Sequence, residues 1–179
     1  MSTKPEIIAI VLSKLQIEKG DVFVDVGCGT CSVSIHAAKF ASKIYAIDDR
    51  KEAIEKCRQN FMINGIENFE LIHSEASLAI PNLHNIDCAF VGGTRNLEKV
   101  LKVLSKKVRK RIVINAVRIE TVARIISTMK SLGIFEEALL VQISKGYLLA
   151  NETAFKPLNP VYIVVSSEPV SEQTLTLNP

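Results

Sequence analysis

Short runs of β-forming residues alternate with amphipathic helical stretches along most of the chain. This alternation predicts a mostly parallel sheet with helices on both faces, which is a doubly wound α/β fold in three layers. The expected strands are Val22–Val26, Lys43–Ile47, Phe69–His73, Cys88–Val91 and Ile112–Asn115. The expected helices are Lys4–Leu15, Ser32–Phe40, Lys51–Asn64, Leu97–Lys106 and Ile119–Leu132.

Two longer β-rich runs, Glu137–Ser144 and Val161–Ser166, close the series and flank a loop rich in Gly, Asn and Pro. A closing hairpin of this kind resembles the one that methyltransferase sheets carry and most dinucleotide-binding sheets lack. We therefore expect a seven-stranded sheet with one antiparallel strand, in a single domain over residues 1–170. Residues 171–179 are expected to form a polar C-terminal tail.

The bulk composition is that of a globular protein. Of 179 residues, 47% are hydrophobic and 23% are charged, and the net charge is +3. The longest apolar runs are much shorter than the ~20 residues of a membrane span, and the N-terminal residues lack the apolar core of a secretory signal. We therefore expect no membrane partner and a cytoplasmic location. The mild positive charge permits an anionic partner but does not require nucleic acid.

The four cysteines lie in or beside expected core elements, so a disulfide framework is not expected. They are Cys28, Cys31, Cys57 and Cys88. The spacing of Cys28 and Cys31 matches a redox motif. Within a glycine loop, however, two small residues are the plainer interpretation. The three histidines show no metal-ligand spacing, and no metal is expected.

Residues 24–31 read VDVGCGTC and join an apolar strand to a helix through two glycines. Glycines allow a tight turn and close approach of a ligand to the backbone. The dinucleotide fingerprint requires a third glycine where Ser32 stands. Asp25 would also repel phosphates, but it favours the cationic amino group or sulfonium of S-adenosylmethionine. The segment therefore predicts cofactor contacts at Asp25, Gly27, Cys28, Gly29 and Thr30. Methyltransferases of this type usually have glycine where Cys31 stands.

Further cofactor contacts are expected where the later strands end. Asp48 follows the second strand, 19 positions after Gly29, and could accept hydrogen bonds from both ribose hydroxyls. The alternative makes Asp48 or Asp49 the N-cap of the next helix, and we expect Asp49 to be the cap. Glu75 and the Ala76 amide are expected near the adenine, with a solvated turn as the alternative.

Gly92 and Gly93 follow the fourth strand and again indicate close backbone approach to the cofactor. Enzymes that methylate exocyclic amines of bases tend to carry an Asn/Asp-Pro-Pro-aromatic segment at this point. The chain lacks that segment, which argues against such chemistry.

With these segments assembled, the chain resembles the decarboxylating cobalt-precorrin methyltransferases of anaerobic cobalamin biosynthesis. The resemblance covers nearly the whole chain and includes residues 3–7, 25–30, 90–93, 115–117, 145–146 and 158–162. It implies the class I S-adenosylmethionine-dependent methyltransferase fold, a cofactor contact at Thr3, and S-adenosylhomocysteine as a product. It also implies methylation of carbon 15 of a tetrapyrrole, loss of carboxylate from an acetate side chain, and a homo-oligomer, namely a tetramer. The family usually has Glu where Asp48 stands, which keeps a carboxylate.

Methyl transfer to an electron-rich ring carbon needs alignment more than a strong base, and no catalytic residue is identified. The substrate carries many carboxylates, which should meet cations near the carboxyl ends of the strands. The candidates are Lys4, Arg95, Arg118, Lys145 and Lys156. The most basic stretch, residues 106–111, precedes the fifth strand and is expected to be a solvated helix end on the opposite side.

Two other functions stay open on the sequence alone. One is methylation of RNA, such as tRNA, or of protein by the same fold, although those enzymes usually add a binding extension. The other is a non-catalytic module that binds S-adenosylmethionine. The set of Gly27, Gly29 and Asp48 argues against the second alternative.

Overall fold

The computed structural model describes residues 3–167. Its helices are α1 (Pro5–Leu15), α2 (Ser32–Ala37), α3 (Lys51–Ile63), α4 (Ala76–Ala79), α5 (Leu97–Lys107) and α6 (Ile119–Ser131), with a 3₁₀ turn η1 (Ile80–Asn82). Its strands are β1 (Val22–Val26), β2 (Lys43–Asp48), β3 (Phe69–His73), β4 (Cys88–Val91), β5 (Arg111–Ala116), β6 (Phe135–Val141), β7 (Ser144–Leu149), β8 (Glu152–Pro157) and β9 (Val161–Ser166).

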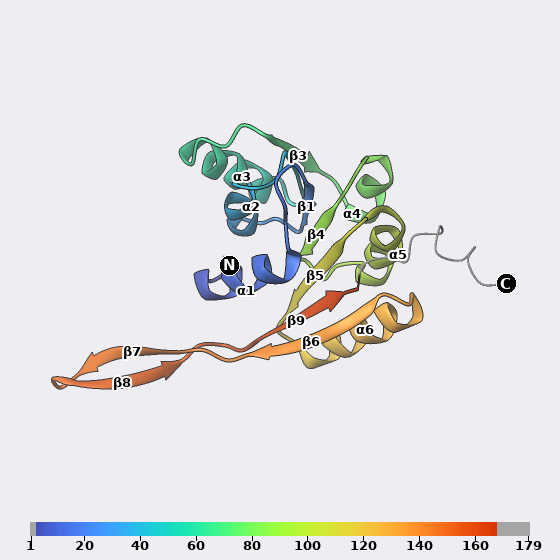
Figure 1. Cartoon of the computed structure of the whole chain (residues 1–179). Coiled ribbons are helices and arrows are strands. Elements are labelled where there is room, and N and C mark those ends of the chain that lie inside the picture. The colour runs from blue at the N-terminus through green and yellow to red at the C-terminus, as the bar shows by residue number, and fades with distance from the viewer. Residues whose placement is uncertain (1–2, 168–179) are drawn as a thin grey trace.

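Seven of these strands form one sheet in the order β3-β2-β1-β4-β5-β9-β6 (Figure 1). β1 to β5 pair in parallel, whereas β9 runs antiparallel to both of its neighbours, β5 and β6. The expected α/β fold, with a mostly parallel seven-stranded sheet and one antiparallel strand, is confirmed.

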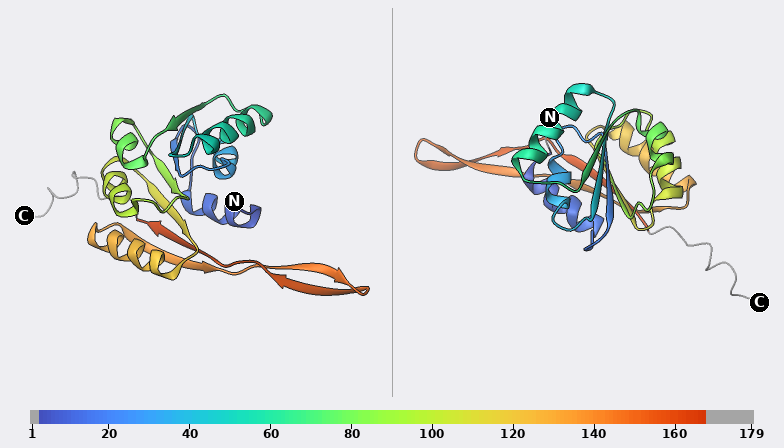
Figure 2. Two further views of the ribbon diagram at one scale, coloured as in Figure 1. Left: turned by 180° about the vertical axis from the view of Figure 1, so that it is seen from behind. Right: turned by 90° about the horizontal axis from the view of Figure 1, so that it is seen from above.

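Helices cover both faces of the sheet and complete the three layers (Figure 2). α1, α2 and α3 pack on one face, and α4, α5 and α6 pack on the other. Neighbouring residues of β1 serve opposite faces, because Phe23 joins the core under α1 to α3 and Val24 joins the core under α4 to α6. Burial on both faces explains why the central strands read as continuous apolar runs.

Residues 144–157 differ from expectation, because they form a β-hairpin, β7 and β8, instead of a loop. We call this hairpin the arm; it projects from the body of the protein (Figure 1), and its strands pair from Ser144↔Pro157 to Leu149↔Glu152. Ala150 and Asn151 form the turn with φ values of 48° and 64°, the positive values that two-residue hairpins favour. All six residues of β7 are exposed, so the arm lacks the buried face that marks a strand in sequence.

Smaller differences concern element boundaries. α2 ends at Ala37 instead of Phe40, and β6 begins at Phe135 and stops at Val141. The short helix α4 and the turn η1 were not expected, since four residues carry no helical periodicity. The basic stretch does lie at the amino ends of the strands, where Lys110 pairs with Asp21 at 2.8 Å.

No helix within residues 3–167 is long and apolar enough to cross a membrane. The expected polar tail, residues 171–179, lies outside the described residues. The domain boundary at residue 170 therefore stays a prediction.

Candidate functional site

The strand order reverses beside β1, because the chain first adds β2 and β3 on one side and then β4 and β5 on the other. Open α/β sheets bind ligands at such a point, outside the carboxyl ends of the strands. A cavity of about 640 Å³ opens there. A smaller pocket of about 60 Å³ adjoins it and shares Gly27 and Asp48 with it.

The structure brings the residues predicted to contact the cofactor together around these two pockets. Asp25, Gly27, Cys28, Gly29 and Thr30 line the large cavity from the end of β1 and the loop after it. Thr3, Asp48 and Gly92 complete that wall from the start of the chain and from the ends of β2 and β4. Glu75 and Ala76 line the smaller pocket.

The floor of the cavity depends on a contact between two backbones. Gly27 has φ +70°, and a Cβ placed on it would lie 2.6 Å from the backbone nitrogen of Gly93. No real Cβ tolerates that distance, and the atom it meets cannot move aside as a side chain would. The Gly27 amide donates to the Ile47 carbonyl at 2.8 Å, which ties the turn to β2 as well. Glycine at position 27 is therefore required by sterics as well as by backbone conformation.

Asp25 lines the cavity and carries a buried acceptor without a hydrogen-bond partner. Its carboxylate is buried, its Oδ2 accepts the Ser34 hydroxyl at 2.6 Å, and its Oδ1 has no hydrogen-bond partner. Burial raises the pKa of Asp25 to about 7, because the Ser34 hydrogen bond offsets only part of the desolvation and the Asp48 carboxylate adds repulsion. A buried acceptor of this kind favours a cationic ligand group.

Asp48 is held as an anion by the groups around it. Its Oδ2 accepts the Gly29 amide and Nη2 of Arg50, each at 3.0 Å, and its Oδ1 accepts the backbone amide and Nε of Arg50 at 3.1 and 2.9 Å. Burial alone would raise the pKa of Asp48, but the hydrogen bonds from Arg50 and Gly29 outweigh it and lower the pKa below its usual value.

Asp49 is not the helix cap that the sequence suggested. α3 has Arg50 at its N-cap position without a side-chain cap, and it is Asp48 that accepts the Arg50 amide. Asp49 instead forms an ion pair with Arg95, which reaches across from the loop after β4. The pair forms because that loop and the end of β2 both border the switch point.

Of the cations proposed for the substrate, only Arg95 lines the two pockets. Lys4 and Arg118 are exposed and line neither pocket. Lys145 and Lys156 face each other in the register of the arm, and Lys145 pairs with Glu6 at 2.6 Å. The structure therefore separates these cations into one at the cavity and four outside it.

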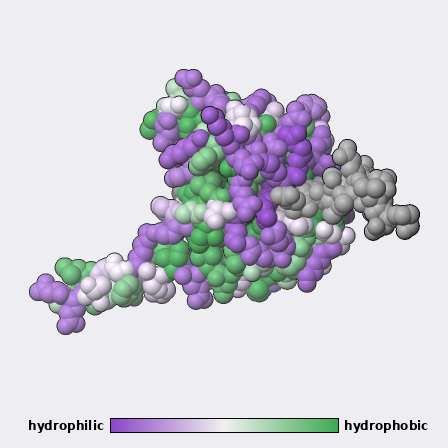
Figure 3. Space-filling view, in the orientation of Figure 1, coloured by the Kyte–Doolittle hydropathy of each residue, from purple (hydrophilic) through white to green (hydrophobic). Residues whose placement is uncertain are grey.

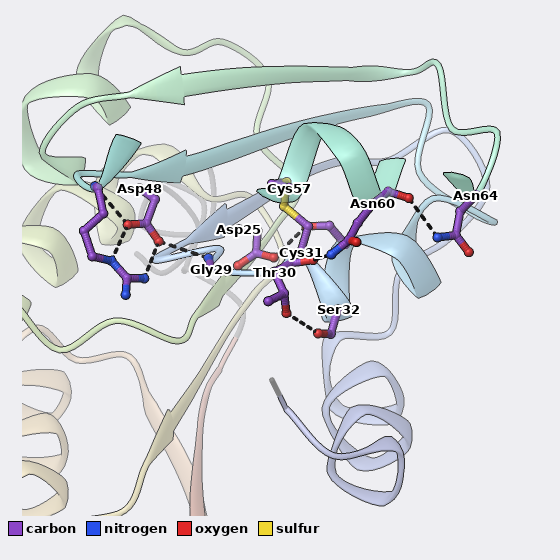
Figure 4. Close-up of a disulfide and its surroundings, with 11 residues drawn as sticks. Asp25, Gly29, Thr30, Cys31, Ser32, Asp48, Cys57, Asn60 and Asn64 are labelled. Carbon is purple, nitrogen blue, oxygen red and sulfur yellow. Dashed lines mark hydrogen bonds and ion pairs between the residues drawn. A yellow bond between two sulfur atoms is a disulfide. The ribbon is translucent and has the colours of Figure 1, made fainter. Parts of the chain in front are cut away.

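A disulfide joins Cys31 to Cys57 of α3, contrary to the expectation that the cysteines are simply small core residues (Figure 4). Cys28 and Cys88 are free thiols. The redox spacing of Cys28 and Cys31 therefore pointed to the wrong partner, because Cys31 is bonded to Cys57 of α3 although the Cys28 sulfur also lies nearby. Sequence spacing alone does not reveal a contact between separate elements.

Comparison with known proteins decides the family. The sequence profile of the precorrin methyltransferase domain matches residues 1–167. The chain belongs to the precorrin methyltransferase family. A relative from Methanosarcina acetivorans named probable cobalt-precorrin-6B C(15)-methyltransferase (decarboxylating) is 53% identical and aligns over 93% of either chain.

Solved structures agree with the precorrin methyltransferase assignment. The crystal structure of precorrin-8w decarboxylase from Methanobacterium thermoautotrophicum superposes with a TM-score of 0.89 at 30% identity, covering 93% of this chain and 92% of that one. A SAM-dependent O-methyltransferase from Thermotoga maritima shares the fold with a TM-score of 0.81 at 13% identity, covering 96% of this chain and 68% of that one. The expected class I methyltransferase fold and the family resemblance are both confirmed.

Several residues that line this precorrin methyltransferase pocket were not predicted from the sequence. Arg50 is the most important, since it binds both oxygens of Asp48, and Lys56 of α3 also lines the cavity. A cation two residues after a proposed ligand carboxylate was a usable signal for Arg50. Lys56 offered none, because it looks like any solvated lysine on a helix.

The contact between Gly27 and Gly93 predicts an unusually large cost for Gly27→Ala. Gly133→Ala is a matched control, because Gly133 also has φ +70° but a Cβ there would meet nothing within 4 Å. We expect the control to lose about 1–2 kcal/mol of unfolding free energy from backbone strain alone, and Gly27→Ala to lose clearly more. Urea denaturation of both variants measures the difference. Equal losses would show that Gly93 does not constrain Gly27.

Proposed function

We propose that this chain is a cobalt-precorrin C15-methyltransferase that uses S-adenosylmethionine and decarboxylates its tetrapyrrole substrate. One observation carries the proposal: a relative with this printed name is 53% identical over 93% of either chain. The cavity at the switch point supports it, because its volume and the carboxylates of Asp25 and Asp48 that line it suit the cofactor. S-adenosylmethionine supplies the methyl group, which leaves from a sulfonium.

Residues of the cavity fit the parts of this cofactor. The unpaired Oδ1 of Asp25 suits the cationic amino group of the methionine part. The turn at Gly27 and Gly29 provides a surface without side chains, which allows a ligand to approach the backbone. A cavity of about 640 Å³ is in the range of small-molecule sites.

Asp48 is proposed to accept both ribose hydroxyls in place of the Arg50 guanidinium. The guanidinium now supplies two of its hydrogen bonds, from Nε and Nη2. The side chain of Arg50 is 64% exposed, so it can swing into solvent when a ligand takes its place. The Gly29 amide stays on Oδ2 and keeps the carboxylate oriented.

The smaller pocket is the proposed adenine site. Glu75 is oriented by the Ser77 hydroxyl, which donates to its Oε2 at 2.5 Å, and the Ala76 amide follows directly. Beyond the cofactor, Arg95 lines the cavity with a largely exposed guanidinium that can bind a substrate carboxylate. Lys4, Arg118, Lys145 and Lys156 are proposed as further contacts for the many carboxylates of a macrocycle larger than the cavity.

In this proposal the protein acts chiefly by alignment. The cavity walls fix the donor, and the cations orient an electron-rich ring carbon toward it. Decarboxylation leaves an electron pair that the conjugated macrocycle can take up, so the protein need only hold the acetate carboxylate in a suitable pose. A cytoplasmic location stays a prediction.

The proposal predicts methyl transfer to a cobalt-precorrin with release of carbon dioxide. The purified protein would be incubated with methyl-labelled S-adenosylmethionine and a cobalt-precorrin, and label and carbon dioxide would both be measured.

Asp48→Ala should weaken binding of S-adenosylhomocysteine by about 1–3 kcal/mol, the scale of hydrogen bonds to a charged group. Label in tRNA but not in the tetrapyrrole would refute the proposed substrate, and unchanged affinity in calorimetry would refute the ribose contact.

Asp25 predicts that cofactor binding strengthens as the pH rises. With a pKa of about 7 the carboxylate is neutral in acid and ionised in base, and only the ionised form attracts the ligand amino group. We expect the affinity for S-adenosylhomocysteine to rise about tenfold between pH 6 and pH 8. Asp25→Asn should bind weakly with little change over this range. A wild-type affinity that does not vary with pH would contradict the contact.

We further propose that the chain assembles as a homo-oligomer, a tetramer, and that the arm is in the interface. Leu148 and Phe155 of the arm are 74% and 69% exposed, and hydrophobic side chains are visible there in the space-filling view (Figure 3). An unsupported two-stranded hairpin is marginally stable in water, and contact with a second copy would stabilise it.

Leu148→Asp should therefore lower the molecular mass in solution, measured by light scattering after gel filtration. Met62→Asp is the control, because Met62 is 71% exposed on α3, away from the arm. A monomeric wild type, or equal effects of both variants, would refute the role of the arm.

A further inference from the structure

Three cysteine sulfurs gather beside the cofactor loop. Those of Cys28, Cys31 and Cys57 lie within 4.8 Å of one another and are all buried. Cys31 and Cys57 are 5.2 Å apart at their Cα atoms, which lies within the range that disulfides require. Figure 4 shows that this bond links the loop after β1 to α3. The loop is thus covalently joined to a helix 26 residues further along the chain.

Cys31 holds an unfavourable backbone conformation. Its φ and ψ are 57° and 28°, in the left-handed region that glycine adopts readily and other residues avoid. It immediately precedes α2 as the N-cap residue and makes no side-chain cap hydrogen bond. The bond to Cys57 is therefore the interaction that fixes this side chain in place.

Both ends of the disulfide are next to residues that line the cavity. Thr30 and Ser32 flank Cys31 in the chain, and Ala53 and Lys56 lie on α3 within a turn of Cys57. A hydrogen bond also connects the loop to α3: the Asn60 side-chain amide donates to the Thr30 carbonyl at 2.9 Å. Breaking the disulfide leaves this hydrogen bond as a tie between the loop and α3. Cys31 then loses the covalent bond on its side chain, and its backbone hydrogen bonds to Cys28 and Ile35 are left to oppose departure from the left-handed region.

We propose that the Cys31–Cys57 disulfide is a redox-controlled clamp on the cofactor loop, so that the oxidised protein binds S-adenosylmethionine more tightly than the reduced protein. The inference rests on the proposed cofactor site. In the oxidised protein the loop is fixed in its binding conformation. In the reduced protein, binding must also force Cys31 back into the left-handed region, which opposes it.

The clamp closes by exchange with an external disulfide R–S–S–R, either a small molecule or an oxidoreductase. One cysteine thiolate attacks it, forms a mixed disulfide and releases R–S⁻. The second thiolate then displaces the other R–S⁻. The two protein thiols lose two protons and two electrons, and the external disulfide becomes two R–SH.

Linkage fixes a second property of the clamp. If oxidation strengthens cofactor binding tenfold, the bound cofactor must favour the oxidised form by the same factor. For a two-electron couple, tenfold corresponds to about 30 mV in reduction potential. Cofactor binding should therefore make the disulfide harder to reduce.

Cys28 is the alternative partner. Its sulfur is close to the other two, but burial raises the pKa of its thiol, and the negative charges of Asp25 and Asp48 raise it further. The structure pairs Cys31 with Cys57 and leaves Cys28 as a free thiol. A thiol that stays protonated is also a poor nucleophile, which disfavours exchange onto Cys28. Three sulfurs at this spacing could also bind a soft metal ion in the reduced protein.

The experiment compares protein treated with oxidised glutathione and protein treated with dithiothreitol. Alkylation under denaturing conditions and mass spectrometry count the thiols and identify the bonded pair, whether or not the protein binds a cofactor. Calorimetry with S-adenosylhomocysteine then measures affinity in both states. We expect a Cys31–Cys57 bond only after oxidation, a melting temperature higher by about 10 °C, and affinity higher by about tenfold.

Two variants separate the clamp from general damage to the core. Cys57→Ala should bind like reduced wild type under both treatments. Cys31→Gly should also be insensitive to redox state, but it should bind more tightly than Cys57→Ala by roughly fivefold, because glycine adopts the left-handed conformation without strain.

Several outcomes would overturn the inference. Equal affinities of oxidised and reduced wild type would remove the clamp, and a Cys28 bond in the peptide map would remove the pairing. A zinc ion retained by the reduced wild type but not by Cys57→Ala would show a metal site instead. Absence of binding by every form, with the disulfide present, would refute the proposed cofactor site and leave the disulfide itself established.

Discussion

The contact between the backbones of Gly27 and Gly93 governs the geometry of the whole site. β1 and β4 pair in parallel as far as Val26↔Val91, and the chain leaves both strands immediately afterwards. A Cβ on Gly27 would force these two turns apart. Because the loops after β1, β2 and β4 all border the cavity, a displacement at this point would move the carboxylates of Asp25 and Asp48 together with the turns. The backbone contact between Gly27 and Gly93 therefore helps to set the positions of the Asp25 and Asp48 carboxylates.

Two carboxylates in one cavity are kept in different states by their surroundings. Asp25 is buried with one oxygen unpaired, and its pKa rises to about 7. Asp48 receives hydrogen bonds on both oxygens, and its pKa falls. Asp25 therefore gains most from a ligand that brings a positive charge, whereas Asp48 gains most from one that brings hydrogen-bond donors. A cation and a diol at the two positions match two parts of the proposed cofactor, its amino group and its ribose.

The sequence predicted the strands of the body and the residues around the cavity for a common reason. Buried parallel strands read as apolar runs, and the glycines and carboxylates that follow them mark the edge where ligands bind. The arm was not predicted because, apart from the half-buried Ala154, its strand residues are exposed on both faces and show no alternation of polar and apolar burial. The Cys31–Cys57 bond and the Asp49–Arg95 ion pair were not predicted, because each joins elements that are brought together only when the sheet folds. Sequence periodicity reports local burial and says little about such contacts.

The pairing of Arg50 with Asp48 has a consequence for ligand choice. The guanidinium gives two side-chain hydrogen bonds to the carboxylate, one to each oxygen. A ligand that displaces it must return two donors, or one oxygen of the buried carboxylate keeps only its hydrogen bond from a backbone amide. A nucleoside with adjacent 2′ and 3′ hydroxyls meets this condition, and a deoxynucleoside does not. In the proposed function, displacement of Arg50 would therefore favour ribonucleosides over their deoxy counterparts.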